Sequence, residues 1–220
     1  MKKFLLSAAL VLAGCVSMSA QNIFNNPANE AYFGLRAGFD LSCPGKITSN
    51  GVGVDMFKNG AGFEVGGIYN IPVVANFYVE PGLKLFYDTY SVKNDWNIYD
   101  GFGIDGISIR KFGMRIPVMA GYRFDFTRDI SVSVFIGPEL EVGFVGKEHA
   151  KSGDRSKSES VYGDDGFLKR TNLLWDFGAG VSYRNYYFSV SGGIGMLNMY
   201  NASHGKFHEN RVTFSLGYNF

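Results

Sequence analysis

Bulky apolar side chains alternate with small or polar ones in eight separate stretches of this chain. In the last stretch, residues 211–220, every second residue from Val212 to Phe220 is apolar, and the residues between them are polar or glycine. A strict period of two is typical of a β-strand, because successive side chains point to opposite faces. The other seven stretches are residues 32–41, 62–71, 77–88, 107–124, 130–144, 173–184 and 187–196.

Turn and loop residues separate these stretches, and no long amphipathic helix lies between them. Eight is an even number of strands, which can close on itself. The predicted fold class is therefore all-β, an eight-stranded antiparallel up-and-down β-barrel. Two irregularities are expected: a bulge at Pro81, and a bulge near Arg110, because Ile107 and Ile109 have the opposite parity to the apolar residues that follow them.

The volume of the side chains indicates which face of the barrel is inside. An eight-stranded barrel has an interior just wide enough for side chains or one small ligand. The apolar face carries several dozen bulky groups, and aromatic residues make up 16% of the chain, so this face would overfill the interior. The other face, of glycine, serine and charged residues, suits a narrow lumen. The prediction is a transmembrane barrel with its apolar face in lipid; the alternative is a soluble lipocalin-like barrel that binds a ligand.

The N-terminal residues have the three parts of a secretory signal peptide. Lys2 and Lys3 make the first residues basic, Phe4 to Leu12 form a largely apolar core, and small residues precede Gln21. We expect a signal peptide at residues 1–20, a short periplasmic segment at 21–30 and the barrel at 31–220. The residues before Cys15 also resemble a lipobox, so lipidation of Cys15 is the alternative to cleavage after Ala20. After residue 20 no apolar run is long enough for a transmembrane helix.

Short and long connections alternate along the chain. The short ones lie at residues 72–76, 125–129 and 184–185, and the long polar ones at 43–60, 92–106 and 147–168. This asymmetry is typical of an outer-membrane barrel with short periplasmic turns and longer extracellular loops. It places both termini in the periplasm. The last outer loop, about residues 201–206, is expected to be short.

The face assigned to the lumen carries seven acidic and seven basic residues. Because an isolated buried charge is costly, we expect them to form a salt-bridged and mostly occluded interior; a gated ion path is the alternative. The predicted lumen charge network is Arg36, Asp40, Glu64, Glu80, Lys84, Asp88, Lys111, Arg115, Arg123, Glu139, Glu141, Asp176, Arg184 and Arg211.

Charge and cysteine content exclude several classes of function. The net charge of +1 includes Lys2 and Lys3, so the processed chain would carry about −1, and without a basic patch no nucleic-acid partner is expected. Cleavage would leave Cys43 as a lone cysteine, which excludes an intramolecular disulfide. We expect no cofactor.

Metal and catalytic sites are not expected either. The acidic residues Asp154, Glu159, Asp164 and Asp165 do not have the spacing of a calcium loop and are interpreted as a solvated loop. The alternative enzyme hypothesis is a lipid-acting Ser-His-Glu site formed by Ser203, His204 or His208, and Glu209 near the outer rim.

Four sequence blocks resemble the PorT-like outer-membrane barrel family, also called the outer membrane protein beta-barrel domain family. They are residues 114–124, 137–139, 176–181 and 218–220. The resemblance implies a barrel like the OmpA and OmpX barrels, in the outer membrane of a Gram-negative bacterium. The terminal Tyr218 and Phe220 resemble the C-terminal signal that the barrel-assembly machinery recognises. Some family members belong to a protein-secretion apparatus.

The function expected from these observations is non-enzymatic. We expect a structural or interaction role through the extracellular loops, with outer-membrane lipid, the barrel-assembly machinery and an extracellular or secretion-apparatus protein as partners. The main alternative is transport, as a small channel or a component of a secretion apparatus. A fold alone does not identify an activity.

Overall fold

The computed structural model describes residues 30–49, 52–93, 106–152, 155–163, 166–201 and 205–220. Residues 31–220 form one structural unit, which is described by itself. The expected signal peptide at residues 1–20, including Cys15, lies outside the described residues. Its cleavage remains a prediction.

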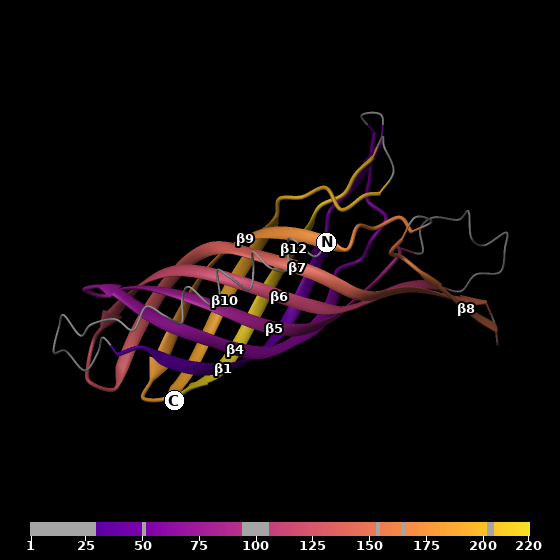
Figure 1. The fold of residues 1–220 in the computed structure, drawn as a ribbon. Helices are drawn as coiled ribbons and strands as arrows, with labels where there is room; N and C mark the ends of the chain where they lie inside the picture. Colours follow the sequence, from indigo (N-terminus) through magenta and orange to yellow (C-terminus); the bar gives the residue numbers. More distant parts are fainter. Residues whose placement is uncertain (1–29, 50–51, 94–105, 153–154, 164–165, 202–204) are drawn as a thin grey trace. The chain divides into compact units, whose positions relative to one another are not determined.

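Within the described residues, eight long strands form a closed antiparallel barrel, which confirms the predicted fold class. Each strand pairs with the next, β12 pairs with β1, and the β6–β7 pairing completes the ring (Figure 1). The strands are β1 (Tyr32–Pro44), β4 (Gly60–Val74), β5 (Phe77–Ser91), β6 (Gly106–Asp125), β7 (Ile130–Ser152), β9 (Thr171–Tyr183), β10 (Tyr186–Gly195) and β12 (Glu209–Asn219).

The two ends of the barrel differ in their connections. The joins 75–76, 126–129 and 184–185 lie at one end, called the turn end, together with the start of β1 and the end of β12. Ala75 and Arg184 have φ angles of 48° and 53°, as two-residue hairpin turns require. The longer joins lie at the opposite end, called the loop end. The expectation of a short last loop is wrong: it runs from residue 196 to 208 and contains a further strand.

Four short strands extend the structure at the loop end. Strands β2 (Ile47–Ser49), β3 (Val52–Val54) and β11 (Gly205–Lys206) form a small sheet. Strand β8 (Arg155–Ser160) pairs with the last residues of β7, and in Figure 1 this hairpin projects beyond the barrel strands. The sequence did not indicate these strands, because each is only two to six residues long, too short for a period of two to be recognised.

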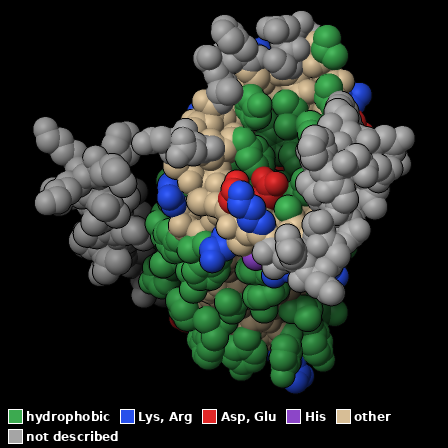
Figure 2. All heavy atoms as spheres, turned by 90° about the vertical axis from the view of Figure 1, so that its right-hand side faces the viewer, with side chains coloured by type: hydrophobic (Ala, Val, Ile, Leu, Met, Phe, Trp, Pro, Cys, Tyr) green, Lys and Arg blue, Asp and Glu red, His purple; other side chains and the backbone are tan. Residues whose placement is uncertain are grey.

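The faces of the strands are arranged as a membrane barrel requires. Large apolar side chains point outward, with Phe63 59% and Leu216 65% exposed, whereas Lys111 and Arg115 are fully buried inside. This is the reverse of a soluble ligand-binding barrel, in which apolar groups line the interior. Figure 2, which views the loop end, shows hydrophobic side chains over the barrel wall and Lys and Arg side chains around the rim. The described residues include no helix long and apolar enough to cross a membrane.

Both predicted bulge positions are wrong. Ile109 faces the interior with the same parity as Lys111, so β6 needs no bulge near Arg110. The extra residue lies on β7, where the register with β6 shifts between Phe112 and Gly113 and makes Phe144 and Val145 both exposed. At Pro81 the pairing of β5 with β6 keeps its register. The register of β4 with β5 shifts instead between Pro72 and Val74, beside the turn.

Candidate functional site

Arg115 lies at the centre of the barrel interior. Its Nη1 atom is 2.6 Å from Asp40 Oδ2 and 2.9 Å from Glu64 Oε2, and its Nε atom is 3.0 Å from Glu141 Oε2. Its other nitrogen pairs with Asp88. These partners come from β1, β4, β5 and β7, so one guanidinium on β6 connects five consecutive strands of the ring. Arg115 also lies over the ring of Phe86, at 4.1 Å from its centroid.

Three further cations complete the charged centre. Arg211 of β12 pairs with Glu139, and its Nη1 atom lies 3.3 Å from Glu141 Oε2; Asp176 Oδ2 is 3.5 Å from the same guanidinium. Lys84 Nζ lies 2.7 Å from Glu64 Oε1. Lys111 Nζ lies 2.7 Å from an oxygen of Glu209. The charges are therefore cross-linked rather than arranged along an open path.

The interior toward the turn end is polar and less crowded with charge. Arg36 stacks on Tyr187 at 4.2 Å, Glu80 accepts a hydrogen bond from Asn70 Nδ2 at 3.1 Å, and Arg123 donates one to the Tyr32 hydroxyl at 3.1 Å. A cavity of about 40 Å³ lies beside Arg36, Glu80 and Lys84. A cavity of this volume holds very few water molecules.

Arg184 does not belong to the interior, and its assignment to the lumen is wrong. It lies in the β9–β10 turn with a positive φ angle, and its largely exposed side chain is 3.5 Å from Asp129 across the neighbouring turn. The alternating pattern predicted a strand that includes Arg184, but β9 ends at Tyr183 and the hairpin turn starts at Arg184.

Glu209 is the interior carboxylate that the sequence analysis missed. It is buried and pairs with Lys111, but its position beside His208 had suggested a rim site. With Glu209 included and Arg184 removed, eight carboxylates face six cations among the described interior residues. Carboxylates therefore outnumber cations in the interior by two. The interior charge network is defined as Arg36, Asp40, Glu64, Glu80, Lys84, Asp88, Lys111, Arg115, Arg123, Glu139, Glu141, Asp176, Glu209 and Arg211.

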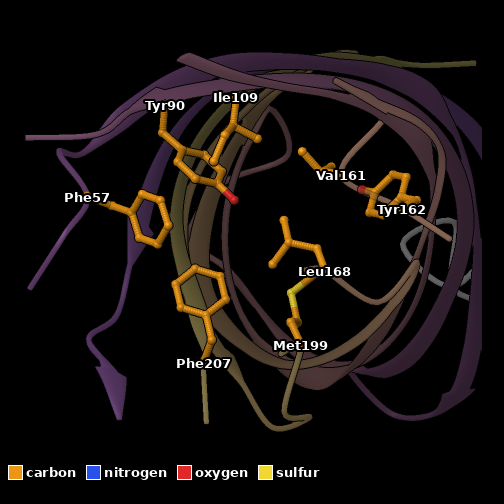
Figure 3. Close-up of a cluster of buried hydrophobic side chains, with 8 residues drawn as sticks. All are labelled: Phe57, Tyr90, Ile109, Val161, Tyr162, Leu168, Met199 and Phe207. Carbon is orange, nitrogen blue, oxygen red and sulfur yellow. The ribbon is translucent and has the colours of Figure 1, made fainter. Parts of the chain in front are cut away.

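An apolar cluster covers the charged centre at the loop end. Two of its residues come from the strand ends of β5 and β6, and six come from the loops. Figure 3 shows their side chains pointing into the mouth of the barrel. This cluster, called the apolar cap, consists of Phe57, Tyr90, Ile109, Val161, Tyr162, Leu168, Met199 and Phe207, all of them buried.

Close packing holds the cap on the strands. A methyl group at Gly146 of β7 would lie 2.5 Å from Tyr162 Cε2, so only glycine leaves room for this ring. Burial raises the pKa of the Tyr162 hydroxyl to about 12, which keeps it neutral at physiological pH. Arg170 lies over the same ring at 5.2 Å. The described residues of the loop after β8 are therefore packed in a defined way around the cap.

The other sequence candidates are not assembled into a catalytic or metal site among the described residues. His208 Nδ1 lies 3.1 Å from the Gly195 carbonyl oxygen, whereas Glu209 points to Lys111; Ser203 and His204 lie outside the described residues. Glu159 pairs with Lys157 at 2.5 Å, and Asp154, Asp164 and Asp165 lie outside the described residues. No group of three or more potential metal ligands is found in the described part of the chain.

The C-terminal aromatic residues lie on the outer surface at the turn end. Tyr218 packs against Tyr186 and Phe220, with ring centroids 5.5 and 5.1 Å apart. Phe220 also lies 6.0 Å from Phe33, and its amide donates a hydrogen bond to the Phe33 carbonyl. The last residues therefore contribute to the junction at which β12 meets β1.

A comparison with protein-family models agrees with this architecture. The family model described as outer membrane protein beta-barrel domain matches residues 19–201. Among solved structures, Ail of Yersinia pestis is 18% identical over 87% of this chain and 99% of its own, with a TM-score of 0.43. Neisserial surface protein A is 13% identical over 87% of this chain and 99% of its own, with a TM-score of 0.45. OprG of Pseudomonas aeruginosa is 11% identical over 87% of this chain and 97% of its own, with a TM-score of 0.46. A search of the curated proteins finds no match.

Proposed function

Because the chain belongs to the outer membrane protein beta-barrel domain family, we propose that it is a closed, non-catalytic barrel that carries folded loops on the outer face of the outer membrane. In this proposal the short turns and both termini lie in the periplasm. The loops provide the surface for interactions with extracellular partners, and the barrel holds them in place.

The filled interior is the observation that carries this proposal. Arg115 connects carboxylates from four strands, and the apolar cap packs across the mouth above it. An ion on its way through would have to displace a buried salt-bridge network and then cross an apolar layer. Both steps are costly, so the geometry favours a scaffold over transport by a small channel or by a secretion component.

Conductance in planar lipid bilayers tests this choice. The folded protein is inserted at neutral pH and compared with the double variant Arg115→Ala/Phe207→Ala, which removes both the central guanidinium and a cap ring. The proposal predicts no stable current steps for the natural sequence and more frequent openings for the variant. Regular current steps from the natural sequence would instead support the transport function.

The orientation is tested by labelling single cysteines in intact cells. Cys43→Ser provides the background, and Val52→Cys and Arg128→Cys place thiols at the exposed loop end and turn end. A membrane-impermeant maleimide is expected to label Val52→Cys in intact cells and Arg128→Cys only after the outer membrane has been permeabilised. The opposite pattern would reverse the proposed orientation.

A further inference from the structure

Two cations face each other on the outer wall at the loop end. Arg110 of β6 and Lys147 of β7 are direct cross-strand partners, and both side chains are exposed. Like charges in this position destabilise a sheet. No salt bridge joins either of them to another of the described residues. The pair thus offers two positive charges to a ligand at a fixed spacing.

The wall on the barrel side of this pair is apolar. The adjacent outward pair is Phe112 and Val145, and the bulge exposes Phe144 beside them. Arg170 lies at the same border: its guanidinium donates a hydrogen bond of 2.8 Å to the Phe144 carbonyl oxygen and is held over the Tyr162 ring. Three cations therefore lie where the apolar wall ends and the polar β7–β8 hairpin begins.

We propose that Arg110, Lys147 and Arg170 bind the phosphate groups of lipid A, the glycolipid anchor of lipopolysaccharide, while Phe112, Phe144 and Val145 contact its acyl chains. Guanidinium and ammonium groups make strong charge-assisted hydrogen bonds to phosphate. Lipid A carries its phosphate groups directly beside its acyl chains. It can therefore contact the three cations and the adjacent apolar side chains at the same time. The inference rests on the proposed function, because the loop end must face the outer leaflet.

Charges elsewhere on the described surface are arranged differently. At the turn end Arg184 is paired with Asp129. In the loops next to β1 and β12, Lys46 and Lys206 are exposed, and these two strands lie on the opposite side of the ring from β6 and β7. These lysines are therefore suitable for a matched control in which the same charge is removed from the same end.

Binding of purified lipid A to the detergent-solubilised full-length protein tests the proposal. We expect bisphosphorylated lipid A to bind about tenfold more tightly than lipid A without its phosphates, because hydrogen bonds between two charged groups are stronger than those between neutral ones. The double variant Arg110→Gln/Lys147→Gln is expected to lose this preference, and Lys46→Gln/Lys206→Gln to keep it. A large excess of inorganic phosphate should not displace the lipid.

Three results would overturn the inference: no preference for the phosphorylated lipid, equal affinity in Arg110→Gln/Lys147→Gln, or full displacement by inorganic phosphate, which would assign the site to a free anion. The Arg110→Gln/Lys147→Gln variant should fold normally, because it removes two like charges that repel each other. A difference in gel mobility between its unboiled and boiled samples verifies that it is folded. A closed, non-conducting barrel that shows no phosphate preference contradicts only this inference. Current steps in bilayers contradict the proposed function and leave lipid binding unaffected.

Discussion

Arg115 Nη1 lies 2.6 Å from Asp40 Oδ2 across the barrel interior, and both side chains are fully buried. The two residues are on β6 and β1, which are separated in the ring by β5 and β4. Their contact is therefore made through the lumen and not along the sheet. It makes the charged centre a cross-link between the two sides of the barrel.

Replacement of Arg115 by Met is expected to destabilise the barrel strongly. The change leaves several buried carboxylates without their shared cation, and breaking a buried ion pair costs about 3–5 kcal/mol. Urea unfolding in lipid vesicles measures the loss. Asp88→Asn should cost less, because carboxylates outnumber cations in the interior. Arg184→Gln, which removes an exposed pair, should change stability by less than about 1 kcal/mol. Similar losses in all three variants would contradict the central role of Arg115.

Truncation of the apolar cap is expected to loosen the loops and leave the barrel closed. Phe207 is fully buried, and replacing such a ring by Ala costs about 3–5 kcal/mol. Because most of its cap partners are loop residues, we expect Phe207→Ala to speed protease cleavage of the loops in reconstituted protein. Val52→Ala, at an exposed position of the same end, is the control. Unchanged cleavage in Phe207→Ala would show that the cap does not order the loops.

The C-terminal aromatic residues are expected to act in assembly. Phe220→Ala or Tyr218→Ala should lower the amount of folded protein in outer membranes several-fold, because the assembly machinery would bind the last strand less well. Leu216→Ala, at another outward position of the same strand, tests whether lost lipid contact alone explains the change. Quantitative immunoblots of unboiled membranes measure the folded fraction. An equal loss in Leu216→Ala would assign the effect to the strand as a whole.

Alternation along the strands was sufficient to predict the barrel. Each strand buries one face in the lumen, so a period of two in residues 130–144 or 211–220 directly indicates a strand. The same parity put Asp40 and Arg115 on one face. Which carboxylates surround Arg115 cannot be read from parity, because contacts across the lumen depend on the tilt and register of strands that are not neighbours.

The apolar cap could not be predicted in the same way. Phe57, Leu168 and Phe207 lie in loops without a repeating pattern, and their partners come from several loops at once. Ile109 did carry a signal, since its parity differs from that of the apolar residues after it. That difference was interpreted as a bulge, whereas it marks the point where the lumen changes from charged to apolar. The error at Arg184 likewise arose because a period of two does not indicate where a strand ends.

Processing of the N-terminus is expected to produce a chain that begins at Gln21. The intact mass of protein isolated from outer membranes would then match residues 21–220 without lipid, and Cys15→Ser should leave location and mass unchanged. A mass that includes acyl chains on a chain beginning at Cys15 would contradict cleavage after Ala20 and would establish the lipoprotein alternative.

The most direct test of a closed barrel in the outer membrane is fractionation of expressing cells, followed by electrophoresis of the detergent-extracted protein with and without boiling. We expect recovery in the outer membrane and a clear difference in mobility between the unboiled and boiled samples, because a closed barrel resists detergent until it is heated. Recovery in the soluble periplasm, or a mobility that does not change on boiling, would contradict a closed barrel in the outer membrane.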